Sequence, residues 1–377
     1  MAALEGDCEG ALAARDRILA DDPGNLTALI MSTQELGALG RYEEGLEQIH
    51  RMMKLSPFGP IEPMRHLETG FLISLGRYEE ARAANQRMTG IWKACLRQNI
   101  ELADGRFAVA ESLTRANLDD PRVLADLPDL YWTSLAWVRF GRGALKDADE
   151  ALTRGLEALR RAHDPSGFIP YYPRIFTELS VLSDGFVPLP AGPAERDTSL
   201  TALLNRGLLA AVRRDAVVAR RCLEALHRRP RRDLAFELGA VPLIEARVAA
   251  MEGRPGEAVR LLRPFDRIRY QRQGVSLIWA HWWLADAFEQ MGQPDSAAWY
   301  LERLERTPST GGAGHYGAYV HRRLALLDAK LGRVADAERN LAVTERLWDQ
   351  PDPAIRRMLD EARTAVRAAR AMSPAPG

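Results

Sequence analysis

The sequence predicts an all-α solenoid, in which antiparallel helix pairs follow one another along the chain and each pair packs on the next. Three observations support this prediction. The segments Leu39–Glu44 and Leu75–Glu80 are identical, LGRYEE, although they lie 36 residues apart, and such identity indicates an internal repeat. Apolar residues on either side of these segments recur at the helical period. Glycines that would separate the two helices of a pair recur at Gly40, Gly76, Gly105, Gly143, Gly253, Gly292 and Gly332.

The clearest unit is Gly274–Pro308, which has the pattern of two amphipathic helices around a tight turn. Gly292 and Pro294 interrupt the helical pattern between them. The packing positions lie at helical spacing: His281, Leu284, Ala285 and Phe288 in the first helix, and Ala297, Leu301 and Leu304 in the second. One such pair cannot bury both of its faces, so it requires similar pairs on either side.

The rest of the chain supplies these neighbouring pairs. The N-terminus opens on half a unit, a helix over residues 5–20. We expect this helix either to cap the array or to be the second helix of a unit whose first helix has been lost. A full unit follows over residues 29–57, and others surround Gly143, Gly253 and Gly332. The unit over residues 203–230 has Arg214-Asp215 where a glycine is expected, so we expect its turn to be longer or differently shaped.

One stretch interrupts the pattern. Residues 164–198 are rich in proline and glycine, with a helical run only near residues 174–183, which argues against two regular helices. We interpret this stretch as a degenerate unit or an insertion. It would separate an N-terminal array over residues 1–163 from a C-terminal array over residues 199–370, followed by a tail over 371–377.

The repeated pattern, with a large residue, a small one, a turn glycine, an alanine and a closing proline, resembles the tetratricopeptide repeat. The resemblance covers roughly three quarters of the chain, as measured by the repeats found. It implies a right-handed superhelix whose concave groove holds a segment of another protein. The array also resembles tetratricopeptide regions of bacterial serine/threonine kinases, adenylate cyclases and transcriptional activators. The alternative is therefore the sensor part of a longer bacterial signalling protein.

Composition limits the function classes. Hydrophobic residues make up 46% of the chain and charged residues 27%, as in a folded soluble protein. Basic and acidic residues both total 51, so the chain has no overall charge that would attract nucleic acid or an anionic membrane. The N-terminus lacks the features of a signal peptide, and no apolar stretch is long enough to span a bilayer. We therefore expect a cytoplasmic protein, and its scarcity of lysine suggests a GC-rich bacterial genome.

No pattern in the sequence indicates catalysis. Phosphate-binding, dinucleotide-binding, zinc-protease, nucleophile-elbow and calcium-loop motifs are absent. Cys8, Cys95 and Cys222 lie far apart, and the seven histidines lack ligand spacing. We expect neither catalytic residues nor a metal or cofactor, although a helical array can in principle hold an enzymatic site in its groove.

An aromatic and polar stripe is the first candidate binding site. Trp279, Trp282, Asp286 and Gln290 are spaced by three, four and four residues, apart from the packing stripe of the same helix. By the resemblance, this stripe faces the groove, and adjacent units add Arg247 on one side and Tyr319 and Arg322 on the other. Tryptophan, tyrosine and arginine are frequent binding hot spots. The alternative is that both tryptophans are buried in the core.

A basic segment is the second candidate. Residues 205–232 hold nine arginines against two acidic residues, and the patch we single out is Arg213, Arg214, Arg220, Arg221, Arg228 and Arg229. Such a patch could bind phosphates or nucleic acid, although it lacks the aromatic residues that stack on bases. The alternative is an outer helix face that pairs with acidic residues of adjacent units.

Overall fold

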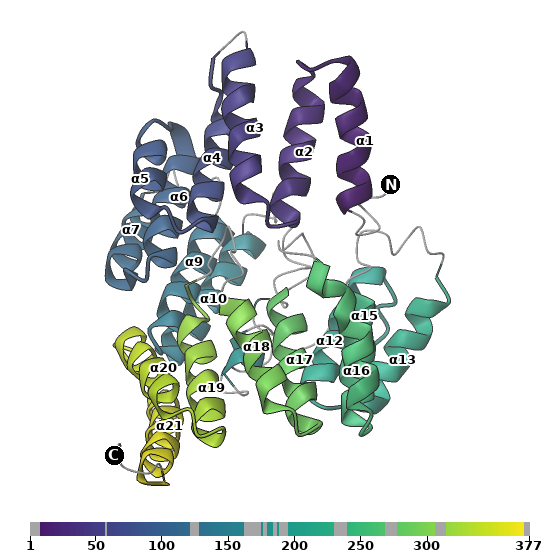
Figure 1. The fold of residues 1–377 in the computed structure, drawn as a ribbon, viewed down its shortest axis with the longest axis vertical. Helices are drawn as coiled ribbons and strands as arrows, with labels where there is room; N and C mark the ends of the chain where they lie inside the picture. The colour runs from purple at the N-terminus through teal and green to yellow at the C-terminus, as the bar shows by residue number, and fades with distance from the viewer. Residues whose placement is uncertain are drawn as a thin grey trace.

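In the computed structural model, helices follow one another through the described residues, most of them in antiparallel pairs (Figure 1). The structure describes residues 8–56, 59–120, 128–161, 175, 179–183, 187, 195–229, 240–267, 277–305 and 314–372. Within these ranges every regular element is a helix. The predicted all-α array of helix pairs is therefore confirmed.

Eight hairpins account for most of the described residues. They are α2 (Leu26–Ala38) with α3 (Tyr42–Leu55), α4 (Glu62–Ser74) with α5 (Tyr78–Gln86), α6 (Gly90–Ala103) with α7 (Phe107–Asp119), α9 (Pro128–Gly141) with α10 (Leu145–Arg161), α12 (Leu200–Val212) with α13 (Ala216–His227), α15 (Ala240–Met251) with α16 (Pro255–Leu262), α17 (Leu277–Gln290) with α18 (Pro294–Glu305), and α19 (Gly317–Lys330) with α20 (Val334–Leu347). A 3₁₀ helix, η3 (Arg263–Arg267), follows α16. Single helices flank the hairpins: α1 (Cys8–Asp21) packs on α2, and α21 (Pro353–Met372) packs on α19 and α20.

The predicted turn glycines all adopt the left-handed conformation that favours glycine. Their φ angles are 73° at Gly40, 70° at Gly76, 72° at Gly105, 84° at Gly143, 75° at Gly253, 70° at Gly292 and 73° at Gly332. Five residues after each of the last six lies a fully buried alanine: Ala81, Ala110, Ala148, Ala258, Ala297 and Ala337. In the first hairpin the same position is Gly45, where an added Cβ would overlap the Phe71 ring. Small side chains therefore let the helices approach closely.

The turn between α12 and α13 has the same shape as the glycine turns, so our expectation of a longer or different turn was wrong. Arg214 takes the glycine position with a φ of 60°, and Ala219, five residues later, is fully buried. The amide of Asp215 donates to the carbonyl of Ala210 at 2.8 Å, as the amide of Arg77 donates to that of Leu72 at 2.9 Å. An arginine in this conformation costs about 1 kcal/mol relative to glycine.

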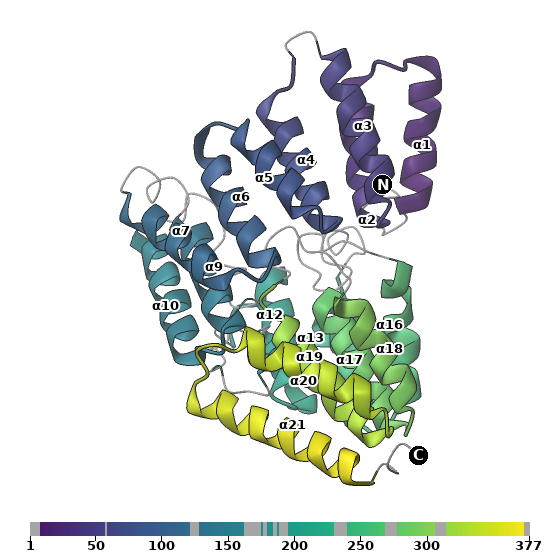
Figure 2. The same cartoon turned by 60° about the vertical axis from the view of Figure 1, so that its left-hand side comes forward.

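The array curves until its C-terminal hairpin meets the middle of the chain (Figures 1 and 2). The Arg142 guanidinium pairs with the Asp349 carboxylate at 2.8 Å. The amides of Gln350 and Asp352 donate to the carbonyls of Arg142 and Gly143, both at 3.0 Å. A Cβ on Gly314 would overlap the carbonyl oxygen of Leu102. These contacts between distant parts of the sequence fix the curvature of the array.

The hydrophobic core is divided along the array. One cluster runs from Leu29 to Ile100, and a larger one from Leu135 to Leu359. The predicted irregular stretch, residues 164–198, lies largely outside the described residues, as do residues 373–377 of the tail. The division into two arrays stays a prediction. None of the described helices is both long and apolar enough to cross a membrane.

Candidate binding cavity

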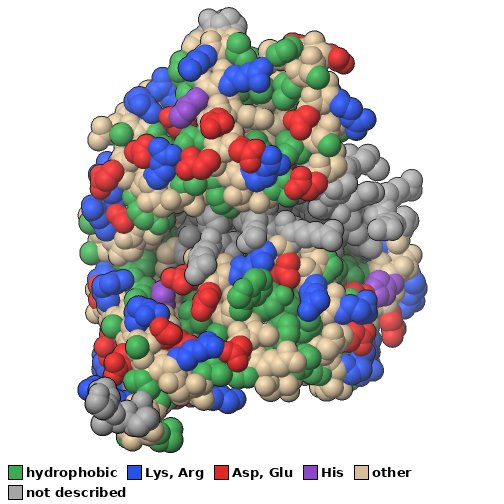
Figure 3. Space-filling view, viewed as in Figure 1, with side chains coloured by type: hydrophobic (Ala, Val, Ile, Leu, Met, Phe, Trp, Pro, Cys, Tyr) green, Lys and Arg blue, Asp and Glu red, His purple; other side chains and the backbone are tan. Residues whose placement is uncertain are grey.

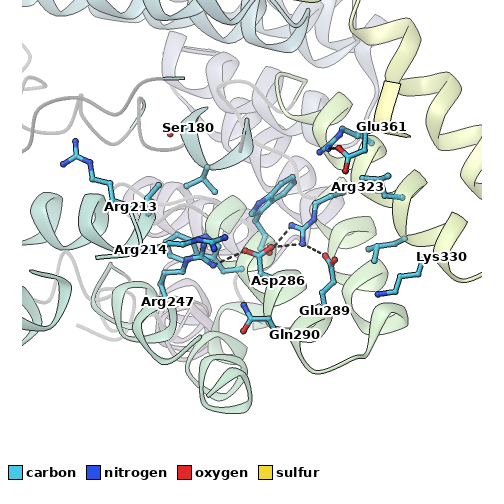
Figure 4. Close-up of a pocket in the computed structure, with 17 residues that line it drawn as sticks. Ser180, Arg213, Arg214, Arg247, Asp286, Glu289, Gln290, Arg323, Lys330 and Glu361 are labelled. Carbon is cyan, nitrogen blue, oxygen red and sulfur yellow. Dashed lines mark hydrogen bonds and ion pairs between the residues drawn. The ribbon is translucent and has the colours of Figure 1, made fainter. Parts of the chain in front are cut away.

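A cavity of about 860 Å³ lies along the first helices of four consecutive hairpins (Figure 4). Its walls come from α12, α15, α17 and α19, with contributions from α21 and from residues 180–181. We call it the α17 cavity, because α17 supplies five of the lining residues: Trp282, Trp283, Asp286, Glu289 and Gln290. Among the lining residues, the exposed side chains of Arg213, Arg214, Gln290 and Lys330 form its rim.

Basic residues outnumber acidic ones in the lining. The basic residues are Arg213, Arg214, Arg247, Arg322, Arg323 and Lys330, and the acidic ones are Asp286, Glu289 and Glu361. The formal charge of the described lining is therefore +3. An excess of this size in a concave site attracts anions.

Asp286 is the centre of an ion-pair network on one wall (Figure 4). Its carboxylate accepts from Arg247 at 3.1 Å and lies 2.7 Å from a guanidinium nitrogen of Arg323. Arg323 also pairs with Glu289. On the far side, Arg322 donates to Glu361 at 2.5 Å and to the carbonyl of Met358 at 3.2 Å. Most of the lining carboxylate charge is thus already matched to arginines on neighbouring helices.

Two tryptophans form the apolar wall. Trp282 and Trp283 are 5% and 3% exposed, so each belongs both to the core and to the lining. The Arg323 guanidinium lies 4.5 Å from the centroid of Trp282, and that of Arg247 lies 5.5 Å from the centroid of Trp283. Cation–π contacts of this kind hold the two guanidinium planes in place.

The pKa of Arg247 is shifted by its surroundings in the cavity. Burial lowers the pKa of its guanidinium from the usual value, Asp286 opposes this by raising it, and the positive charges of Arg214 and Arg323 lower it further. Its Nε is buried without a hydrogen-bond partner among the described residues.

The structure brings together most of the residues predicted for the groove. Arg247, Trp282, Asp286, Gln290 and Arg322 all line the α17 cavity, as does Lys330. Their part in binding stays a prediction.

Trp279 and Tyr319 do not line the cavity. Trp279 is buried beside Trp283, with ring centroids 5.8 Å apart. Tyr319 stacks on Phe140 at 4.3 Å and donates its hydroxyl to the Phe140 carbonyl at 3.2 Å. The fold-back of the array onto α9 explains the burial of Tyr319, and the sequence pattern does not reveal that contact.

Several lining residues were missed. Arg323 directly follows the predicted Arg322 on α19, so extending the predicted face by one residue position would have included it. Trp283 was overlooked because it is adjacent to both predicted stripes. Glu361 belongs to α21, and no local pattern connects that helix with α17.

The basic segment is split by the structure. Arg213 and Arg214 reach the α17 cavity, whereas Arg220, Arg221, Arg228 and Arg229 lie elsewhere on the hairpin. Arg231 and Arg232 lie outside the described residues. Arg220 pairs with Glu252 of the next hairpin at 3.2 Å, Arg228 lies 3.8 Å from Glu224, and Arg229 donates to the Thr198 carbonyl. Arg221 is exposed on α13. Figure 3 shows basic and acidic side chains interspersed over the described part of one face of the molecule.

The two cysteines with described side chains are buried thiols. Burial raises the pKa of Cys95 to about 12 and also raises that of Cys222, which makes both poor nucleophiles. Within the described ranges, no three histidine, cysteine, aspartate or glutamate side chains are grouped so that they could hold a metal ion.

No family model matches the sequence, and no curated protein matches it. Three solved structures resemble the fold at low similarity. The Cut9–Hcn1 hetero-tetramer of the APC/C has 12% identity and a TM-score of 0.35, covering 98% of this chain and 83% of that one. The P58(IPK) TPR domain has 14% identity and a TM-score of 0.27, covering 98% and 96%.

The third structure, yeast Tom70, has 11% identity and a TM-score of 0.33, covering 97% of this chain and 86% of that one. TM-scores this low carry no argument about function. The glycine turns, the buried alanines and the sequential packing of its helix pairs make this chain a tetratricopeptide-like array.

Proposed function

We propose that this protein is a non-catalytic scaffold that binds a segment of another protein in the α17 cavity. The observation that carries the proposal is the cavity itself: the first helices of four consecutive hairpins enclose about 860 Å³ between tryptophan walls and a charged rim. That volume is typical of ligand-binding sites. A repeat array commonly binds along the surface that its stacked units share.

The lining supports a preformed site. Trp282 and Trp283 are fixed by core packing, and ion pairs hold Arg247 and Arg323. A partner segment would therefore bind without ordering these side chains, which lowers the entropy loss of association. The charged rim would supply most of the affinity and set the orientation of the segment, and the tryptophans would hold Arg247 and Arg323 in place.

We propose the bacterial cytoplasm as the setting, in keeping with the low lysine content and the buried free thiols of Cys95 and Cys222. The alternative, a sensor region within a bacterial signalling protein, would use the same cavity to bind a segment of its partner. Nucleic-acid binding through residues 205–232 is less favoured, because Arg220 and Arg228 already lie near carboxylates and the surrounding charges are mixed.

Selection of short peptides from a display library, followed by fluorescence polarisation, tests the proposal. Gln290 is an exposed rim residue, so Gln290→Trp adds an indole to the cavity mouth without disturbing the core. We expect this variant to bind the selected peptides about tenfold more weakly or worse, equivalent to about 1.4 kcal/mol. Gln34→Trp, on the exposed face of α2, is the matched control and should bind like the wild type.

Two results would contradict the proposal. One is a selection that yields no specific peptide for the wild-type protein. The other is a set of peptides that bind both variants and the wild type equally, because the segment would then bind outside the α17 cavity.

A further inference from the structure

Arg214 occupies a backbone position that glycine holds in each of the other seven hairpin turns within the described residues. The buried Ala219, five residues later, fixes this register independently of the turn itself. A left-handed φ of 60° is unfavourable for arginine and free for glycine. Residues held in such conformations concentrate at functional sites.

Among the described residues, no side-chain contact of Arg214 compensates for this conformation. The Arg214 side chain has no ion pair or hydrogen bond with another described residue. Asp215 caps α13 by accepting from the amide of Val218 at 3.0 Å, but glycine followed by aspartate would provide the same cap. Neither the turn nor the helix start therefore requires an arginine at this position.

The Arg214 side chain instead extends into the α17 cavity and lies beside Arg247 (Figure 4). Two neighbouring positive charges repel each other, and Arg214 contributes to the lowered pKa of Arg247. The lining carboxylate that contacts Arg247, Asp286, is already shared between Arg247 and Arg323. The buried Nε of Arg247 has no acceptor among the described residues. This corner of the cavity thus has more donors than acceptors.

We propose that the α17 cavity binds one anionic side chain of the partner segment, held between the guanidinium groups of Arg214 and Arg247. This inference rests on the proposed function and specifies the chemistry of its ligand. Each guanidinium can donate two parallel hydrogen bonds to an oxyanion, as to a carboxylate or a phosphate. Trp283 and Val212, which also line the cavity, pack against the aliphatic part of that side chain.

The same lining selects against a polyanion. Glu289 and Glu361 lie on the α19 side of the cavity with Asp286 between them and Arg214, so a second or third negative charge on the segment would meet carboxylates. A single acidic or phosphorylated residue flanked by neutral ones is the ligand that this distribution favours.

An array of random short peptides, each with an amidated C-terminus, tests the inference on the full chain. We expect peptides that bind the wild-type protein to be enriched in single acidic residues. For the tightest of these, we compare three forms that differ only at that residue: the acid, its neutral amide, and phosphoserine. Arg214→Asn removes the charge with a residue that tolerates the left-handed conformation, and Arg221→Gln removes one charge from the exposed surface of α13.

We expect Arg214→Asn to weaken binding of the acidic peptide by about tenfold to a hundredfold, as is typical when a charge-assisted hydrogen bond is lost. Arg221→Gln should leave the affinity within about twofold, because exposed charges contribute little at moderate salt. The neutral peptide should bind weakly and equally to the wild type and to Arg214→Asn. Tighter binding of the phosphoserine form would identify phosphate as the preferred oxyanion, and tighter binding of the acid would identify carboxylate.

Equal binding of acidic and neutral peptides, or an affinity for the acidic peptide that Arg214→Asn leaves unchanged, would overturn the inference. If the Gln290→Trp variant still bound such peptides more weakly than the wild type, the proposed function would stand although the inference about Arg214 had failed. An array without any binder would contradict both proposals together.

Discussion

Two turns of the same shape differ in what they contribute to the molecule. The turn between α4 and α5 has glycine at its left-handed position, and a Cβ there would meet only open space. The turn between α12 and α13 repeats its hydrogen bonds and the buried alanine that follows, but has Arg214 at that position. The first turn follows the repeat and builds the fold, whereas the second departs from it by one residue at the rim of a cavity.

This difference separates the residues that build the array from those that give it a ligand. A repeated pattern is stabilising in every unit, so a departure that is unfavourable for the backbone indicates a different requirement. Substitutions with progressively smaller expected effects test this comparison, beginning with the buried alanine that both hairpins share.

The largest effect is expected at the buried alanines. Ala81 and Ala219 are both fully buried five residues after their turns, so Ala81→Arg and Ala219→Arg each place a charge in a closely packed interface. We expect each to reduce the free energy of unfolding by more than about 4 kcal/mol, or to unfold its hairpin. Urea denaturation measures this, and a small loss in only one variant would show that the two hairpins do not share a packing scheme.

A smaller loss is expected at the turn that carries the fold-back contact. A side chain on Gly143 would lie within 3.1 to 3.3 Å of Ile355, Trp348 and Pro351, in addition to adopting a φ of 84°. We expect Gly143→Ala to destabilise the protein by about 2 to 3 kcal/mol, because strain and crowding add. Thermal unfolding measures the loss, and a stability equal to that of the wild type would mean that this contact is not tightly packed.

Gly76→Arg measures the free-energy cost of a left-handed arginine backbone separately from any contact of its side chain. This turn faces open space, so the substitution recreates the backbone of Arg214 without its cavity. We expect a loss of about 1 kcal/mol in the free energy of unfolding. If calorimetry found no loss, an arginine in the left-handed conformation would carry no strain, and the inference from Arg214 would lose its premise.

The smallest effect is a difference in how His321, on α19, and His66, on α4, make the stability of the protein depend on pH. For His321, burial lowers the pKa, but Glu305 and Asn340 raise it more, so the native pKa lies above 6.5. The stabilisation from protonated His321 is therefore complete below about pH 6.5 and is lost as the pH rises through the native value. For His66, burial lowers the native pKa below 6.5, so its stabilisation is lost as the pH falls from 6.5 towards that value.

We therefore expect opposite results from His321→Gln and His66→Gln. The first should reduce the stability mainly below pH 6.5, with a shrinking difference at higher pH. The wild type should lose stability below pH 6.5 because His66 becomes protonated, and His66→Gln should not show this loss. Urea denaturation between pH 5 and 8 measures both, taking these limits from the ordinary range of histidine titration. If the stabilities of the two variants changed with pH in parallel, the opposite pKa shifts of His321 and His66 would be contradicted.

The repeated helix pairs could be predicted from the sequence, but the contact between the C-terminal hairpin and the middle of the chain could not. Turn glycines and buried alanines such as Gly292 and Ala297 are set by local geometry, which recurs in each unit and can be predicted from spacing. The contact between Arg142 and Asp349 joins residues 207 positions apart, and it depends on the summed curvature of all intervening hairpins. The same summed curvature decides whether the Tyr319 side chain faces the groove or packs on Phe140.

The candidate site shows the same limit. The face of α17 that carries Trp282, Asp286 and Gln290 was predicted from its spacing, since these residues lie on one helix. The contributions of Arg214 and Glu361 could not be predicted, because they come from a turn and a helix whose positions relative to α17 depend on the packing of several units.

The most direct test of the account is the stability of Arg214→Gly, measured by urea denaturation with and without a saturating acidic peptide from the array. Without peptide, we expect the variant to be at least as stable as the wild type, because glycine relieves the left-handed strain. With peptide, the wild type should be the more stable of the two, because it binds the ligand more tightly. A variant that is less stable without peptide, or that gains as much from the peptide as the wild type, would contradict the account.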